Sequence, residues 1–230
     1  LFLQQGLIMN KYYYILKNSL LFNGISENEL PSILNCLSAY KKEYSKNQFI
    51  LHKGESVSSI GMVLKGNVHI IKEDYWGNRN IISIVLPGQL FAETYACIQQ
   101  SILQVSVLSA EPTEILFLDI KRILTTCPSA CDYHIRLIKN LMAILAQKNL
   151  LLNDKVTHMA ERTTRKKLLS YLSSQSIKAN KPSFLIPYNR QQLADYLSID
   201  RSAMSAELCK MRDEGLIKFD KNHFTLKYNF

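Results

Sequence analysis

A run of small and polar residues, Arg201-Ser-Ala-Met-Ser-Ala206, stands where the sequence predicts the start of a helix. Asp200 comes directly before it, and an aspartate in that place accepts hydrogen bonds from the free amides of a first helical turn. Small side chains at a helix start let the backbone approach the base edges in the major groove of DNA. These residue types and their spacing therefore favour DNA recognition.

Two short amphipathic segments position this run, one on each side of the link at residues 198–200. Apolar residues recur at helical spacing in both, so each segment is expected to bury one stripe. Gly215 follows as a stop, because glycine takes left-handed backbone angles without steric cost. The short link and the uncharged helix start favour a helix-turn-helix over the commoner helical hairpin. The expected buried residues are Leu193, Ala194, Leu197, Met204, Leu208 and Met211.

The segment after Gly215 predicts a wing. From Ile217 to Lys227, apolar residues alternate on both sides of the turn-rich trio Asp220-Lys221-Asn222, which indicates a β-hairpin. The expected tip carries the cation of Lys221. A hairpin in this place makes the unit a winged helix-turn-helix.

Charge is distributed unevenly along the 230 residues, whose net charge is +9. Residues 157–230 hold 13 Lys and Arg against 7 Asp and Glu, or +6, whereas the longer preceding part has 15 against 12, or +3. The excess lies in the part expected to meet phosphates. No apolar run approaches the roughly 20 residues of a membrane span. Five scattered cysteines in a chain with no secretory signal indicate a reduced, cytoplasmic protein.

The first half of the chain predicts two short helices followed by a small β-barrel or sandwich. Residues 10–22 and 26–39 show helical spacing, and Ser26 with Glu29 resembles a capping box. From Gln48 onward, apolar residues alternate with polar ones, as in strands. Glycine or proline turns separate many of these short alternating segments. The expected strands are 48–52, 60–64, 67–72, 80–85, 102–108 and 113–118, with a hairpin tip at 75–78.

After Pro128, apolar residues again recur at helical spacing, and they do so for about 27 residues. This pattern predicts one long helix. A helix this long between a barrel and a small DNA-binding module is expected to pair with a second copy through residues 131–159, although packing on the barrel is the alternative. Asn149 is a candidate for setting the register of that pair. The expected stripe is Ile138, Leu141, Met142, Leu145, Leu152, Val156 and Met159.

A further helix is predicted at residues 161–174. Leu168, Leu169 and Leu172 are expected to face the interior. Its charge run indicates either a solvated face or contacts to backbone phosphates. The cations of this run are Arg162, Arg165, Lys166 and Lys167.

This order of elements resembles the cyclic-AMP receptor/fumarate-nitrate-reduction regulator (CRP/FNR) family. The resemblance implies an α+β fold with an effector-sensing β-roll at 10–129, a dimerisation helix at 130–157 and a winged helix-turn-helix at 158–230. It also implies a bacterial transcription regulator rather than an enzyme, a homodimer on palindromic double-stranded DNA, and contact with RNA polymerase. The residues that carry it are Leu51-His-Lys-Gly-Glu55 with Gly66, Pro87-Gly-Gln-Leu-Phe-Ala-Glu93, 160–172, and Arg190-Gln-Gln-Leu-Ala194 with 200–205 and Leu208.

The resemblance places an effector site at Glu93 and Thr94, but the matching positions differ from those of cyclic-nucleotide binders. The family's phosphate-holding Arg-Ser pair falls at Leu103 and Gln104, and its adenine-contacting Thr-Ser pair falls at Leu152 and Asn153. A buried phosphate without a cation costs several kcal/mol. The sequence therefore argues against a cyclic nucleotide and favours an uncharged or aromatic effector, a thiol signal at Cys97, or none.

No cofactor or metal is predicted either. An iron–sulfur sensor needs four thiolates, usually clustered near the N-terminus, and only Cys36 lies near it. His52 or His69 as a haem ligand is a weaker interpretation than an ordinary surface or core histidine.

At the DNA end, the resemblance matches Arg201 to the family's first recognition-helix arginine, which can bond guanine O6 and N7. Ser202 and Ser205 are candidates for base or phosphate contacts. Ala206 stands where the family often has a second arginine, so the half-site is expected to differ there, and Ala206 could instead contact a thymine methyl. The remaining candidates for DNA contact are Arg190, Gln191, Ala203, Lys210 and Lys221.

Two rival functions remain open. A cupin-type metal-binding enzyme would need two histidines one residue apart with a carboxylate, whereas His69 has apolar neighbours. An effector-independent regulator of the same fold would be controlled by its abundance alone.

Overall fold

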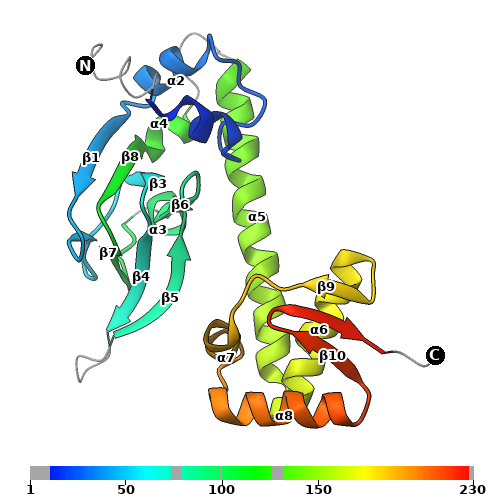
Figure 1. Ribbon diagram of the computed structural model, residues 1–230. Helices are drawn as coiled ribbons and strands as arrows, with labels where there is room; N and C mark the ends of the chain where they lie inside the picture. Colours follow the sequence, from blue (N-terminus) through cyan, green and yellow to red (C-terminus); the bar gives the residue numbers. More distant parts are fainter. Residues whose placement is uncertain (1–10, 74–78, 99, 126–131, 228–230) are drawn as a thin grey trace. The chain divides into compact units, whose positions relative to one another are not determined.

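The computed structural model describes residues 11–73, 79–98, 100–125 and 132–227. The chain forms two compact units, the first ending at Ala146 and the second beginning at Gln147, inside helix α5 (Figure 1). The hairpin tip expected at 75–78 lies outside the described residues. No helix in the described ranges is long and apolar enough to cross a membrane.

The first unit contains two four-stranded antiparallel sheets, in the orders β1-β8-β3-β6 and β2-β7-β4-β5 (Figure 1). Buried residues from both sheets, among them Val63, Val68, Val107 and Ile115, form one core, so the sheets pack face to face. This confirms the predicted β-roll. The strands are β1 (Tyr40–Tyr44), β2 (Phe49–Leu51), β3 (Ser59–Lys65), β4 (Val68–Glu73), β5 (Arg79–Val85), β6 (Leu90–Phe91), β7 (Ser106–Ser109) and β8 (Thr113–Asp119).

Three strands differ from the prediction. Strand β1 has charged residues in series and lies at a sheet edge, so its sequence lacks the alternation that marks a half-buried strand. Strand β6 has two residues, too few for any period. Strand β7 begins at Ser106 rather than 102, because Ile102 makes only an isolated bridge with Ser56.

The first helices are shorter than the sequence indicated. Residues 11–18 are helical, and α2 spans Leu30–Cys36 instead of 26–39. Only one of the two expected capping-box bonds forms, since Glu29 Oε2 accepts from Ser26 N at 2.8 Å, while the Ser26 hydroxyl donates to the same carboxylate and Glu29 N donates to Ser26 O. These bonds close a turn ahead of the helix. Ser38, with φ of 48°, follows the C-terminal cap of α2. Two further short helices are α3 (Glu93–Cys97) and α4 (Ile120–Leu124).

Helix α5 spans Asp132–Ala160, close to the expected range, but its apolar residues divide between two faces. Leu137, Leu141 and Ile144 are buried in the core of the first unit. The prediction that Leu141 belongs with the exposed stripe was therefore wrong, because that residue packs against its own chain. Among the other predicted stripe residues, Met142, Leu152, Val156 and Met159 are exposed, while Ile138 and Leu145 are half-buried.

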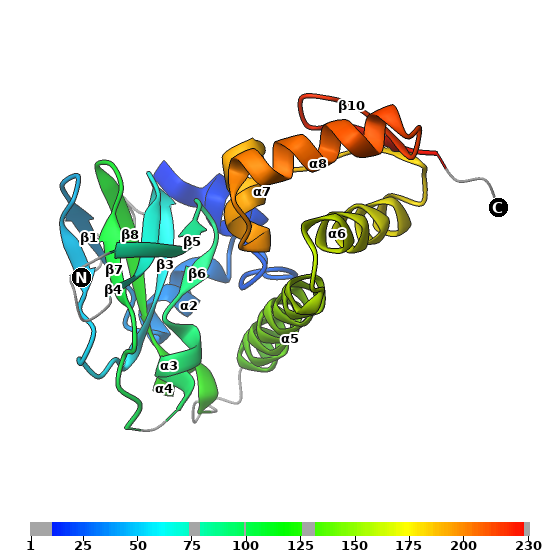
Figure 2. The same cartoon turned by 90° about the horizontal axis from the view of Figure 1, so that it is seen from below.

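The second unit contains the end of α5, the helices α6, α7 and α8, and a three-stranded sheet in the order β10-β11-β9 (Figures 1 and 2). Its core includes Leu168, Leu172, Leu193, Leu208 and Phe224. The elements after α5 are α6 (Thr164–Ala179), β9 (Ser183–Leu185), α7 (Arg190–Leu197), α8 (Arg201–Asp213), β10 (Ile217–Asp220) and β11 (His223–Leu226).

Helix α6 begins three residues later than predicted and ends five residues beyond the predicted end. Thr163 caps it by accepting from Lys166 N, and Asn180 ends it with a left-handed backbone. Tyr171 rather than Leu169 fills the core, because Leu169 lies on the outer side of the helix and is 37% exposed. The predicted inward orientation of Leu169 was therefore wrong.

Candidate DNA-binding site

Reciprocal bonds fix the start of α7. The Asn189 side chain accepts from Gln192 N at 2.9 Å, and Gln192 Oε1 accepts from Asn189 N at 2.9 Å, which is a capping box. At the other end Ser198 takes a left-handed backbone with φ of 50° and reverses the chain. The turn to α8 is therefore set by local backbone chemistry at both ends.

Helix α8 starts at the expected residue. Asp200 Oδ1 accepts from Ala203 N at 2.8 Å and also from the Ser202 hydroxyl. These bonds, the hydroxyl first, lower the pKa of Asp200 and keep its carboxylate charged at the positive end of the helix. Gly215, with φ of 78°, follows the helix as predicted. The predicted buried residues of α7 and α8 are all buried.

The outward face of α8 is slim at its N-terminus. Arg201, Ser202, Ala203 and Ala206 are exposed. The Ser205 hydroxyl donates to Arg201 O at 2.8 Å, which leaves its oxygen lone pairs as acceptors. In the described part of the chain no residue bonds or ion-pairs the Arg201 guanidinium, so this cation is free to bind an anion or a base edge.

The wing has the expected form. Strands β10 and β11 pair antiparallel with Asp220 opposite His223, so the tip is the two-residue turn of Lys221 and Asn222. Lys221 is exposed with φ of 51°. Asn222 Nδ2 donates to Ile186 O at 3.2 Å and ties the tip to the rest of the unit. Strand β9, which pairs with β11, was missed because three residues give no period.

Two cations of the α6 charge run brace the helix-turn-helix. Arg165 pairs with Glu214, at 2.9 Å through Nη1, and with Glu207 at 3.5 Å. Lys167 Nζ donates to Leu197 O at 3.3 Å, at the C-terminus of α7. The remaining two, Arg162 and Lys166, are exposed and can still contact phosphates.

The other candidate contacts occupy two kinds of environment. Lys210 is exposed on α8, and Gln191 Nε2 donates to Asp195 Oδ1 at 2.8 Å. Arg190 is half-buried, with its guanidinium carbon 4.7 Å from the ring centroid of Phe219 and 5.1 Å from that of Phe224. Its contact with the wing was not predicted, because it depends on the register of β10 and β11.

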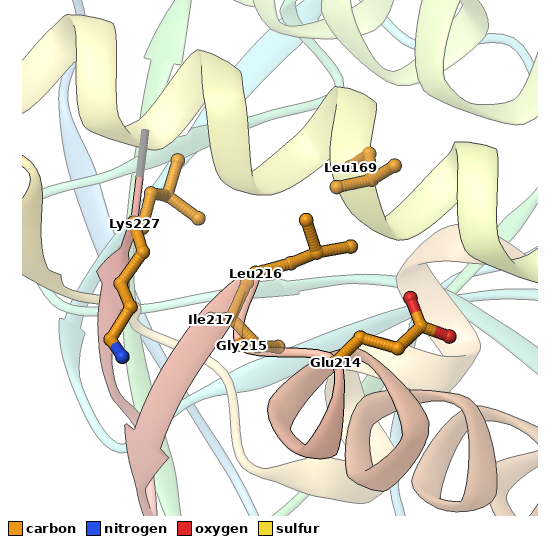
Figure 3. Close-up of a pocket in the computed structure, with 7 residues that line it drawn as sticks. Leu169, Glu214, Gly215, Leu216, Ile217 and Lys227 are labelled. Carbon is orange, nitrogen blue, oxygen red and sulfur yellow. The ribbon is translucent and has the colours of Figure 1, made fainter. Parts of the chain in front are cut away.

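A shallow depression of about 490 Å³ lies between α6, the end of α8 and the wing strands (Figure 3). Leu169 and Leu216 form its apolar side, and Glu214 and Lys227 stand on opposite sides of it. Of the four, Glu214 is already paired with Arg165. The depression is separate from the outward face of α8.

Two of the expected effector residues of the first unit lie in α3, and the other two follow it at 103 and 104, where Leu103 bonds the backbone of Gly54 and Glu55. Glu93 is buried, Thr94 is exposed, Leu103 is buried and Gln104 is exposed. Residues 80–120 contain no lysine, arginine or histidine. Leu152 and Asn153 lie in the second unit, exposed on α5. The structure therefore brings no local cation from this stretch to the position where a phosphate would need one.

Cys97 in the same region is a poor candidate for a reactive thiol. Burial, and then the charge of Glu93, raise the pKa of Cys97. A raised pKa reduces the thiolate fraction that reacts with oxidants. In the described residues no cluster of His, Cys, Asp and Glu could hold a metal ion.

Comparisons with known proteins agree with this arrangement. The cyclic nucleotide-binding domain family matches residues 41–128, and the Crp-like helix-turn-helix domain family matches residues 166–227. The sequence matches no curated protein. Together the two matches define a DNA-binding regulator with a cyclic-nucleotide-binding type of sensory domain.

Solved structures share the fold at low sequence identity. CprK, in a structure with OCPA, has a TM-score of 0.61 at 13% identity, with 85% of this chain and 88% of that chain covered. The regulator CLP of Xanthomonas campestris has 0.56 at 16%, with 85% and 97% covered. FixK2 of Bradyrhizobium japonicum has 0.51 at 18%, with 83% and 93% covered. The chain belongs to the CRP/FNR family of transcription regulators.

Proposed function

We propose that this protein is a homodimeric bacterial transcription regulator that acts in the cytoplasm and binds a palindromic DNA site through α8. The start of α8 carries the proposal, since an unpaired Arg201 lies there among small exposed residues on a helix capped by Asp200. Such a helix start can enter a major groove, with arginine bonding a guanine edge. Lys210 and the wing-tip Lys221 are suited to phosphate contacts, which position the protein without specifying sequence.

An apolar seam along α5 supports the dimer. Its residues alternate at spacings of three and four over four heptads, which is the pattern of a two-stranded coiled coil. Met142, Leu152 and Val156 are each more than 60% exposed. A neighbouring face of the first half of α5 packs on its own unit together with Leu145, and the rest of the seam is left for a second copy. The seam comprises Ile135, Ile138, Met142, Leu145, Asn149, Leu152, Val156 and Met159.

Asn149 interrupts this seam at one core position. Its Oδ1 accepts from Asn153 Nδ2 at 3.0 Å. A single polar residue in a coiled-coil core costs stability but fixes register, because only the aligned pair satisfies its amide. Aligned helices would place two copies of α8 on half-sites about 10 base pairs apart.

We also propose that the first unit senses a small molecule other than a cyclic nucleotide, and that its signal shifts the equilibrium between two dimer arrangements. The absence of cations from residues 80–120 supports this, because an unpaired phosphate would be costly to bury. An effector-independent regulator is the second candidate, favoured by the buried Leu103 at the position of the family's phosphate-binding pair. By resemblance to the family we also propose contact with RNA polymerase.

Two variants test the roles assigned to α8. Arg201→Ala is expected to lower affinity for the selected site by about 1–3 kcal/mol while leaving random-sequence binding nearly unchanged. Lys210→Ala should weaken both by similar factors and reduce the salt slope by about one. Fluorescence anisotropy at several salt concentrations measures these quantities. Equal loss of specific and random binding in both variants would contradict the assignment.

A further inference from the structure

Arg190 has an unusual environment for a cation. It is half-buried at the first position of α7, and no described residue gives its guanidinium a hydrogen bond or an ion pair. Burial lowers the pKa of Arg190, and an electrostatic contribution from Cys209 opposes this. A guanidinium removed from water and lacking a carboxylate retains its capacity to bind an external anion.

The Arg190 guanidinium packs against two aromatic rings of the wing. Phe219 in β10 and Phe224 in β11 are cross-strand partners, and their ring centroids are 5.8 Å apart. Phe224 is fully buried and anchors the pair in the core of the second unit. Because the Arg190 guanidinium carbon lies within 4.7 and 5.1 Å of the two ring centroids, both rings contribute cation–π attraction.

The same contact places Arg190 beside the outward face of α8. Cys209 is exposed and follows Ser205 by four residues, so both lie on the same side of the helix. Arg212, seven residues after Ser205 and so on the same side of α8, lies over the Phe219 ring that Arg190 also contacts. The guanidinium therefore lies next to the surface that carries Arg201 and Ser205, where a DNA backbone would pass.

Arg212 provides an internal comparison. Its guanidinium carbon lies 5.9 Å from the Phe219 centroid, over the same ring. Unlike Arg190, it is paired with a carboxylate, Asp213 Oδ1, at 2.9–3.0 Å. Of these two arginines, Arg190 is the one that contacts the ring without a carboxylate partner among the described residues.

We propose that Phe219 is a positioning residue for DNA binding, which orients the Arg190 guanidinium toward a DNA phosphate and so couples the wing to the helix-turn-helix. Phe219 need not touch DNA itself. This role rests on the proposed DNA binding. It adds Phe219 as a residue that affects DNA binding only through Arg190.

A double-mutant cycle on the full-length protein tests the coupling. Dissociation constants for one selected duplex and one random duplex are measured for the wild type, Phe219→Leu, Arg190→Gln and the double variant. Phe219→Leu is expected to weaken binding to both duplexes about fivefold, and Arg190→Gln about tenfold with a salt slope lower by about 0.9. The double variant should bind as Arg190→Gln does, because the ring has nothing left to position.

Three further variants separate positioning from a merely structural role. Phe219→Tyr keeps the ring and should restore wild-type affinity and salt slope. Arg190→Lys keeps the charge without the planar stacking group, so it should fall between wild type and Arg190→Gln. Arg212→Gln is the matched control. The factor by which it changes the dissociation constant should multiply with the factor for Phe219→Leu. Thermal unfolding of each variant verifies folding, and Phe219→Met replaces Phe219→Leu if the latter does not fold.

The positioning role would be overturned if the affinity losses of Arg190→Gln and Phe219→Leu multiplied in the double variant. It would also be overturned if Phe219→Leu bound DNA as tightly as the wild type. Either result would leave the proposed function standing as long as the wild-type protein binds DNA. A wild type that binds neither duplex would instead refute the proposed function.

Discussion

The start of α8 and the start of α3 are the positions at which we propose contact with DNA and with an effector, and they differ in charge. Helix α8 begins with the unpaired cation of Arg201 on an exposed, capped turn. Helix α3 begins with the buried Glu93 after the left-handed Ala92, within a stretch from 80 to 120 that holds no basic residue. Under the proposed function, the cation at α8 is available to DNA, whereas residues 80–120 offer no basic side chain to pair with a nucleotide phosphate at α3.

The largest expected effect comes from breaking the seam that joins the two DNA-reading helices into one binding site. Val156→Glu puts a charge on the exposed face of α5, where it would be buried in the dimer, while it disturbs neither unit's own core. We expect a monomer in sedimentation and at least about a hundredfold loss of affinity for the palindrome, because half-site binding loses the second contact. Leu151→Glu, also exposed on α5 but off the seam, is the control. A Val156→Glu dimer with full affinity would refute the seam.

The next effect concerns the first unit alone. Glu114 accepts from Lys41 at 2.7 Å, from Lys11 at 3.0 Å and from the Tyr12 hydroxyl, which joins residues 11–18 to β8. Burial opposes its ionisation, but these bonds outweigh burial and lower the pKa of Glu114 to about 2.

Because this folded-state pKa lies below the ordinary value, the stabilisation is present above about pH 4.5 and is lost as the pH falls toward 2. Glu114→Gln should lower the free energy of unfolding by about 2–3 kcal/mol at pH 7 and show a weaker dependence on acid pH. Chemical denaturation between pH 3 and pH 7 measures both. A variant with an unchanged pH profile would show that Glu114 is not the responsible group.

A smaller effect is expected from the cap of α8 in the second unit. Asp200→Ala removes the acceptor for Ala203 N and should destabilise this unit by about 1 kcal/mol. Asp200→Asn keeps the capping oxygen and should recover most of the loss. Denaturation monitored separately for each unit shows which unit loses stability. Destabilisation of the first unit by Asp200→Ala would contradict the assignment.

The smallest expected effect sharpens the comparison of α3 with α8. Cyclic AMP or cyclic GMP at millimolar concentration should change the affinity for DNA less than twofold, because a ligand shifts an equilibrium only by its differential affinity. Calorimetry in the same buffer should show no binding to the first unit. A tenfold gain in DNA affinity with either nucleotide would show that a cation from elsewhere in the chain supplies the missing charge.

What could be predicted from the sequence follows from how local the determining interactions are. The cap of Asp200, the buried Met204 and the wing turn at Lys221 depend on residues within a few positions of one another, and the structure confirms their predicted geometry. Strand β1 was missed because its pairing with β8 joins residues about 70 positions apart and its own sequence is charged. The contact between Phe219 and Arg190 was also missed, because these two residues are far apart in the sequence.

The central claim, that two copies of α8 read a symmetric site, is tested most directly by selecting bound duplexes from a random pool with the full-length protein. The account predicts enrichment of an inverted repeat whose half-sites are centred about 10 base pairs apart, with a guanine in each half-site that Arg201→Ala no longer selects. A pool that yields no common sequence at low ionic strength, or a single unrepeated motif, would contradict it.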